Sequence, residues 1–169
     1  MKKNFFLLLL LLPAYLFAQE KDYFKKDASD FLNGYSNNAL FVEAGGNAFV
    51  VFSLNYDNIF YRKENKSWSG RIGLNPGIGL DDNSFTIPVT VSYLMGRIVS
   101  FETGAGANLL FTRNRSSIFL TGIIGVRYQK RNRVFVKAAA TPFFVRNPKY
   151  FVGDGNVIFW LGLSLGYGF

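Results

Sequence analysis

From residue 39 to the end of the sequence, apolar side chains recur at every second position. The alternation is clearest near the C-terminus, where seven alternate positions are all apolar: Val157, Phe159, Leu161, Leu163, Leu165, Tyr167 and Phe169. Several of the positions between them hold small residues, including Gly162, Ser164, Gly166 and Gly168. A period of two is typical of a β-strand, whose successive side chains point to opposite faces. The segment therefore predicts a strand with one apolar face.

Seven earlier segments repeat the alternation, so the sequence predicts eight strands. In chain order, the predicted segments are Leu40–Gly45, Val50–Tyr61, Trp68–Leu80, Phe85–Met95, Val99–Phe111, Ile118–Tyr128, Val134–Val145 and Asn156–Phe169. Connections of hairpin length predict an antiparallel meander. An even number of strands returns the last one beside the first, so the expected fold class is all-β, an eight-stranded antiparallel up-and-down barrel. The run Gly45-Gly46-Asn47 leaves open a bulge within one long first strand instead.

The first eighteen residues have the layout of a secretory signal peptide. Lys2 and Lys3 form a positive start, Phe5–Leu12 is an apolar run, and cleavage is expected after Ala18. The run is shorter than the ~20 apolar residues that a membrane-spanning helix needs, and no later run is long enough. We therefore expect a cleaved signal peptide at 1–18, a periplasmic segment that is a solvated tail at 19–38, and an outer-membrane β-barrel at 39–169.

Alternation by itself fits two kinds of barrel. A soluble barrel of the lipocalin type holds its apolar side chains inside, whereas a barrel in a membrane holds them outside, against lipid. The polar faces of this chain carry mainly Gly, Ser, Thr and Asn rather than the long charged side chains of a water-exposed surface. Small side chains fit the narrow lumen of an eight-stranded barrel. The sequence therefore predicts a transmembrane barrel with an apolar exterior.

Six charged residues within the predicted strands all fall on the polar faces: Glu43, Asp57, Arg71, Glu102, Arg127 and Lys137. A base that faced lipid at the membrane midplane would cost roughly 2–4 kcal/mol. Inside the lumen, three acids and three bases can instead pair with one another. We therefore expect a lumenal ion-pair network. For Asp57 and Arg127, a position in water near a rim is equally compatible with the pattern.

Aromatic residues on the apolar faces gather at the two ends of the strands. If the N-terminus is periplasmic, one group lies at the periplasmic end: Trp68, Tyr93, Phe101, Tyr128, Tyr167 and Phe169. A second group lies at the outer end: Phe85, Phe111, Phe144 and Phe159. Two aromatic belts are typical of a protein that meets two membrane interfaces. The same orientation places the longest connection, at 147–155, outside the cell.

The composition removes most catalytic and metal chemistry. The 169 residues include no cysteine and no histidine, which excludes disulfides, thiolate sites and the commonest general base. We expect no catalytic residue, no metal site and no cofactor. The net charge of +8 does not indicate nucleic-acid binding, because Lys and Arg gather at the turns. Arg113, Arg115 and Lys149 are expected outside the cell, where they could meet the phosphates of lipopolysaccharide.

The last strand resembles the C-terminal assembly signal of bacterial outer-membrane proteins, in which apolar or aromatic residues alternate up to a terminal aromatic residue. Leu161, Leu163, Leu165, Tyr167 and Phe169 match that pattern. The resemblance implies recognition by the outer-membrane assembly machinery. The remaining segments resemble the small, porin-like barrels of the OmpA/OmpX type in architecture, with no shared internal motif. This likeness implies a monomer surrounded by outer-membrane lipid, and we expect no peptidoglycan-binding domain after the barrel.

An eight-stranded barrel has an interior just wide enough for side chains to fill. We therefore expect a non-enzymatic barrel with a structural or surface-contact role. A narrow channel or binding site for small apolar molecules stays open, and its lining would be Phe41, Phe119, Ile123, Phe135, Phe143, Ile158 and Trp160. A lipid-modifying enzyme would need a nucleophile such as Ser92, Thr121 or Ser164, and without histidine it would lack the usual base.

Overall fold

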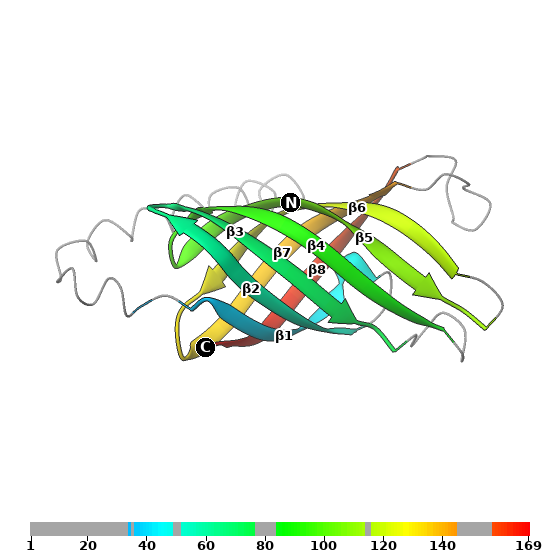
Figure 1. The fold of residues 1–169 in the computed structure, drawn as a ribbon, viewed down its shortest axis with the longest axis horizontal. Helices are drawn as coiled ribbons and strands as arrows, with labels where there is room; N and C mark the ends of the chain where they lie inside the picture. The colour runs from blue at the N-terminus through cyan, green and yellow to red at the C-terminus, as the bar shows by residue number, and fades with distance from the viewer. Residues whose placement is uncertain (1–33, 35, 49–51, 77–83, 114–115, 145–156) are drawn as a thin grey trace, which may run out of the picture.

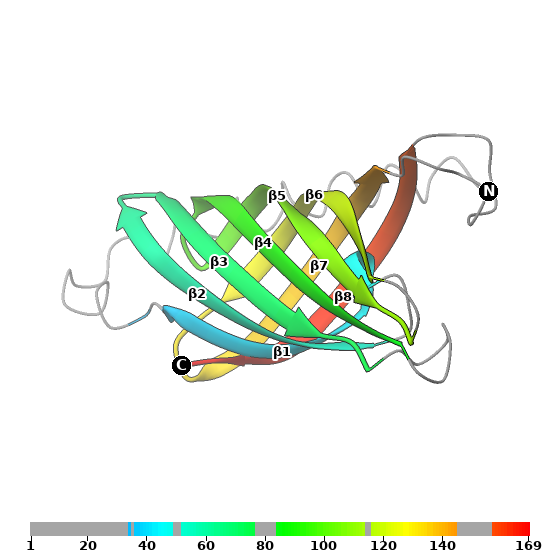
Figure 2. The same cartoon turned by 45° about the vertical axis from the view of Figure 1, so that its right-hand side comes forward.

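The computed structural model of the chain describes residues 34, 36–48, 52–76, 84–113, 116–144 and 157–169. The strands are β1 (Asn38–Gly45), β2 (Ser53–Lys63), β3 (Lys66–Leu74), β4 (Phe85–Gly96), β5 (Val99–Phe111), β6 (Ser116–Gln129), β7 (Arg133–Phe144) and β8 (Val157–Gly168). Each strand pairs antiparallel with its neighbours in sequence, and β8 pairs with β1 to close the barrel (Figures 1 and 2). The expectation of an eight-stranded antiparallel up-and-down barrel is confirmed. In this described part of the chain, no helix is long and apolar enough to cross a membrane.

The first two strands are separate, which excludes the alternative of one long bulged strand. Gly45 and Gly46 have φ angles of 70° and 68°, in the left-handed region that glycine adopts without strain. They end β1, and the short 3-10 turn η2 (Gly46–Ala48) then folds inward to contact β4, β7 and β8. A bulge lies within β2 instead, where the pairing with β3 shifts between Ile59 and Tyr61.

The two ends of the barrel differ in the lengths of their connections. At the end where β1 begins and β8 ends, connections of two, two and three residues join β2 to β3, β4 to β5 and β6 to β7. At the opposite end, the four connections have seven, ten, four and twelve residues. We call the end with the short connections, where β1 begins and β8 ends, the terminal end, and we call the opposite end the distal end. Residues 50–51, 77–80, 145 and 156 of the predicted strands, and the connection at 147–155, lie outside the described residues.

The strands alternate between an apolar outer face and a polar inner face. Large apolar side chains with at least 40% of their surface exposed occur on seven strands; one example from each is Leu40, Tyr56, Ile72, Val91, Ile124, Val136 and Leu163. The inner face buries mainly Ser, Thr, Asn and charged side chains, with a small apolar cluster of Ala39, Phe41 and Phe135. This arrangement is the reverse of a water-soluble barrel, in which apolar side chains fill the interior.

Candidate functional site

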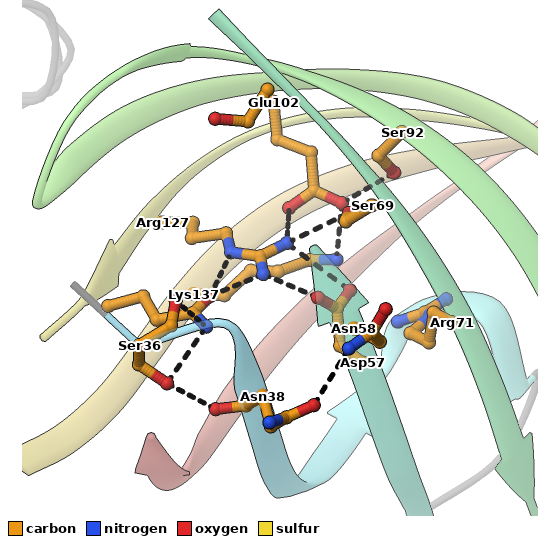
Figure 3. Close-up of polar contacts among 12 residues, drawn as sticks. Ser36, Asn38, Asp57, Asn58, Ser69, Arg71, Ser92, Glu102, Arg127 and Lys137 are labelled. Carbon is orange, nitrogen blue, oxygen red and sulfur yellow. Dashed lines mark hydrogen bonds and ion pairs between the residues drawn. The ribbon is translucent and has the colours of Figure 1, made fainter. Parts of the chain in front are cut away.

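Six charged side chains lie inside the barrel, each at most 3% exposed, and they form four ion pairs. The six are Glu43 on β1, Asp57 on β2, Arg71 on β3, Glu102 on β5, Arg127 on β6 and Lys137 on β7. Strand parity directs all six inward, and three of the four ion pairs join strands that are not neighbours in the wall, so they cross the lumen (Figure 3). Three acids and three bases cancel, so this group adds no net charge to the interior.

Arg127 lies at the centre of the network. Its Nη2 lies 2.6 Å from Oδ1 of Asp57, and its Nη1 donates to Oδ2 of the same carboxylate at 3.3 Å. Nη1 also lies 3.7 Å from Oε2 of Glu102 and donates to Ser69 Oγ at 3.3 Å. The guanidinium donates further to the side-chain oxygen of Gln129. A two-pronged pair with one carboxylate and a second carboxylate nearby is an arrangement that arginine, with its planar fork of donors, suits better than lysine.

Glu102 connects Arg127 to the second base of this group. Its Oε1 accepts a hydrogen bond from Nζ of Lys137 at 3.0 Å and another from Ser92 Oγ at 2.8 Å. Because its Oε2 faces Arg127, the one carboxylate is shared by two cations. Loss of either cation would therefore change the electrostatic environment of the other.

Glu43 and Arg71 form the remaining ion pair, with 2.6 Å between Oε2 and Nη1. Ser164 Oγ donates to the same carboxylate oxygen at 3.2 Å, and the backbone N–H of Asn47 donates to Oε1 at 2.9 Å. Arg71 Nε donates to Thr90 Oγ1 at 3.2 Å. This pair therefore joins four strands and also holds the inward turn η2 in place.

Two phenylalanine rings are built into the charged network. Phe41 on β1 and Phe135 on β7 are both in register with Gly166 on β8, and their rings stack with centroids 4.5 Å apart. The guanidinium of Arg127 lies 5.3 Å from the Phe135 ring centre, and that of Arg71 lies 6.0 Å from the Phe41 ring centre. These distances permit cation–π attraction. The rings thus contact each other and lie close to the cations on either side of them.

The chain itself crosses the terminal end of the lumen. Ser36, which precedes β1, is 1% exposed. Its Oγ donates to the backbone oxygens of Asn38 and Phe169, the latter at 2.9 Å, and Gln129 Nε2 donates to the Ser36 backbone oxygen at 3.1 Å. The expectation of a solvated tail does not hold for Ser36, because polar groups at the mouth of the barrel bind it. Since Gln129 also binds Arg127, this crossing is joined to the ion-pair network.

The lumen is also lined by uncharged amides and hydroxyls. Its buried polar residues include Asn47, Asn55, Asn75, Thr86, Asn108 and Thr121. Thr121 Oγ1 donates to Asn47 Oδ1 at 2.7 Å, which fastens η2 to β6. Within the described residues, both polar side-chain atoms of Asn108 are buried without a hydrogen-bond partner. Buried amides of this kind have the chemistry that binds ordered water.

The apolar residues expected on the lumenal faces have three different outcomes. Four of them are buried: Phe41, Ile123, Phe135 and Phe143. Phe119 is half-buried. Trp160 is 42% exposed, so the expectation that it fills the lumen is wrong. It lies close to the distal start of β8, where the wall ends before the ring can be enclosed. The side chain of Ile158 lies outside what the structure describes.

The three hydroxyl residues considered as nucleophiles have other partners. Ser92 donates to Glu102, Ser164 donates to Glu43, and Thr121 donates to an asparagine oxygen. In the part of the chain that the structure describes, no cluster of acidic side chains could hold a metal ion. These hydroxyls therefore satisfy buried acceptors, which is a structural task.

Among the interior residues that sequence reasoning missed are Ser36, Asn47 and Gln129, which hydrogen-bond to the network or to the segments that enter the lumen. Parity offered a signal for Gln129, because it lies two positions after Arg127 and so shares its face. Ser36 and Asn47 lie outside the regular strands, so no periodic signal pointed to them.

The residues of the expected assembly signal and of the expected outer surface lie on the exterior. Leu161, Leu163, Leu165, Tyr167 and Phe169 point outward from β8 and its end, with exposures between 48% and 78%. Arg113 is exposed at the distal end. Arg115 and Lys149 lie outside the described residues.

Comparison with known proteins adds one likeness in fold. A scan against protein-family models and a search of curated proteins find no match. Among solved structures, the chain is similar to the N-terminal β-barrel domain of OprF from Pseudomonas aeruginosa, with a TM-score of 0.45 and 14% identity, over 80% of this chain and 99% of that chain. In its described part, this chain is a closed, eight-stranded antiparallel barrel with an apolar exterior and a charged, polar interior.

Proposed function

We propose that this protein is an integral barrel of a bacterial outer membrane, exported with a cleaved signal peptide, with a side-chain-filled lumen and a structural or surface-contact role. It works without catalysis or a cofactor, as a monomer. Its partners are outer-membrane lipid, the assembly machinery that reads β8 during biogenesis, and lipopolysaccharide phosphates near Arg113. The inverted distribution of side chains carries this proposal: every strand of the described barrel directs polar or charged residues inward, and seven expose large apolar residues outward.

Only a lipid environment makes that distribution favourable. In water, the exposed rows on β8 alone, with Leu161 at 78% and Leu163 at 68% exposure, would form an apolar patch typical of an interaction or membrane surface. In a bilayer, the same residues contact apolar acyl chains, which is favourable. The closed barrel also leaves no strand edge with unpaired backbone groups in the lipid. The interior then becomes the place where charges are sheltered, and they are paired there.

Aromatic pairs at both ends support the same placement. Trp68 and Tyr93 pack near the terminal end with ring centres 5.1 Å apart, and Phe85 and Phe111 stack near the distal end at 4.8 Å. Aromatic girdles at two levels match the two interfaces of a bilayer. Because short turns of membrane barrels face the periplasm, the terminal end is the periplasmic side in this proposal.

A charge placed on the outer face tests the membrane environment. Leu163→Arg, in the middle of β8, should destabilise the barrel in phospholipid vesicles by about 2–3 kcal/mol, because arginine at the midplane must leave water. The matched control Val134→Arg lies on the same kind of outward face near the terminal end, and it should cost about 0–1 kcal/mol. Urea unfolding in vesicles measures both values. Equal costs, or a stabilised Leu163→Arg variant, would contradict a lipid-facing exterior.

The proposed lumen predicts very low permeability. In planar bilayers, the inserted barrel should show no large, stable conductance, because ion pairs and stacked rings occupy the space between the strands. Folding is verified independently on the same preparation, since a compact barrel resists SDS until it is boiled and migrates faster in a gel without heating. Stable openings of porin size from verified material would refute the filled lumen.

A further inference from the structure

Basic side chains are concentrated at the terminal end of the barrel. Seven of them lie in its three short connections or at the strand ends beside them: Arg62, Lys63, Lys66, Arg97, Lys130, Arg131 and Arg133. Glu64 is the one acidic residue in the same turns and strand ends. At the distal end, by contrast, Arg113 is the one charged residue among those that the structure describes. We call the seven residues the basic collar.

Five side chains of the collar form no ion pair with the other residues that the structure describes. Arg62 donates to the Ser36 backbone oxygen at 3.3 Å, and Arg97 donates to Asn65 Oδ1 at 2.7 Å, so these two help to shape the rim. The other five residues of the collar are Lys63, Lys66, Lys130, Arg131 and Arg133. The four ion pairs of the described residues all lie inside the lumen, and none of them includes one of these five. The six interior charges balance, while these five residues add positive charge along the rim from β2 to β7.

The collar also has a defined depth relative to the outward aromatic residues. Lys66 and Trp68 lie two positions apart on β3, and Trp68 contacts Tyr93 of β4. Lys130 follows Tyr128 by two positions on the β6–β7 side of the barrel. Interfacial Trp and Tyr mark the headgroup level of a bilayer, and long basic side chains beside them extend toward the headgroups. In the proposed membrane placement, the cationic groups of the collar therefore lie at the level of lipid phosphates.

We propose that the basic collar binds the phosphates of anionic phospholipids in the leaflet that the terminal end faces, and so selects phosphatidylglycerol-type lipids for the ring around the barrel. The inference rests on the proposed membrane placement and adds the partner at one rim. Several cations close together around a curved rim attract anionic headgroups cumulatively. This attraction is electrostatic, so it weakens as ionic strength rises.

The two tryptophans of the chain allow a direct test, because Trp68 lies beside the collar and Trp160 lies toward the distal end. In a Trp160→Phe background, Trp68 becomes the sole tryptophan reporter. Its fluorescence is measured in vesicles that contain brominated phosphatidylglycerol or brominated phosphatidylcholine at equal fractions. We expect the anionic lipid to be preferred at Trp68 by about fivefold in relative binding constant, and the preference should shrink at high salt.

Two variants assign the effect to the collar. Replacing Lys63, Lys66, Lys130, Arg131 and Arg133 together with glutamine should bring the preference close to one. The matched control Arg113→Gln, at the distal end, should leave it unchanged. Inorganic phosphate, compared with chloride at equal ionic strength, should reduce the preference no more than chloride does, because the headgroup is presented by the membrane.

Several results would overturn the inference. These are equal quenching by the two lipids in the Trp160→Phe protein, a preference that survives neutralisation of the five residues, or a preference lost through Arg113→Gln. Specific competition by inorganic phosphate would overturn the lipid source. Failure of the membrane placement itself looks different: neither brominated lipid would quench Trp68, and the unheated gel band would not shift.

Discussion

Replacing Arg127 with methionine should lower the free energy of unfolding by about 3–5 kcal/mol, because breaking a buried ion pair leaves an uncompensated charge in the interior. Asp57 would lose both of its hydrogen bonds to the guanidinium, at 2.6 and 3.3 Å, while remaining 1% exposed. Glu102 would keep its contact with Lys137 at 3.0 Å. Most of the lost stability should therefore come from the Asp57 carboxylate, which would stay buried without a cation beside it. Urea unfolding in detergent micelles, followed by tryptophan fluorescence, measures the change.

A second variant separates charge from packing. Arg127→Met combined with Asp57→Asn removes both charges of the pair, so we expect it to recover much of the stability lost in Arg127→Met alone. Replacing a whole buried ion pair by neutral groups is often close to neutral for stability, whereas removing one partner is not. If the single and double variants unfold at the same urea concentration with the same slope, the pair is not what holds this part of the barrel together.

Gly166→Ala should destabilise the barrel by about 3 kcal/mol or more, at the upper end of the cost of overpacking. A Cβ at this position would lie 2.2 Å from the backbone oxygen of Leu40 and 2.5 Å from the Cα of Phe41. These are backbone atoms of β1, so relief requires β8 and β1 to move apart at the seam that closes the barrel. The stacked rings of Phe41 and Phe135 would be displaced as well. The measurement is the fraction of protein that keeps fast gel mobility without heating, together with the urea midpoint.

Gly70→Ala is the matched control for that effect. Gly70 also lies within a strand, but a Cβ there would have its nearest neighbour, the Phe60 ring, at an ordinary contact distance of 3.7 Å. This substitution should change stability by less than about 0.5 kcal/mol, as surface substitutions away from special features usually do. If both alanine variants behave alike, strand propensity rather than the closing seam accounts for the result at Gly166.

Much of the fold could be predicted from sequence because strand parity is local. Each strand reports its two faces through adjacent residues, so the alternation on β8 and its counterparts was enough to predict eight strands and to separate an outer face from an inner one. The same parity assigned Glu43, Asp57, Arg71, Glu102, Arg127 and Lys137 to the polar faces. Two strands joined by a short turn, such as β2 and β3, must also lie side by side and antiparallel, so their pairing could be predicted.

Pairing across the lumen could not be predicted in the same way. Arg127 on β6 meets Asp57 on β2, and Lys137 on β7 meets Glu102 on β5. Neither pair joins strands that are neighbours in the wall. Which charges meet depends on the stagger and tilt of the closed sheet, and these are properties of all eight strands together.

The sequence also could not predict the residues whose positions depart from the alternation of the strands. Trp160 has lumenal parity but lies so near the distal rim that it is exposed. Ser36 and the turn η2 enter the barrel from outside the strands, and hydrogen bonds to Gln129, Glu43 and Thr121 hold them there. Such contacts form only after the strands have closed.

The amino-acid sequence by itself thus determined the strands, their two faces and which face carries the charged residues, because these follow from the two-residue repeat of an extended backbone. Only the tertiary structure decided how the interior is filled: which cation each carboxylate receives, where Phe41 and Phe135 stack over Gly166, and which segments close the lumen. The physical reason is that these contacts cross an enclosed space whose width and stagger exist only once the sheet has joined its two edges.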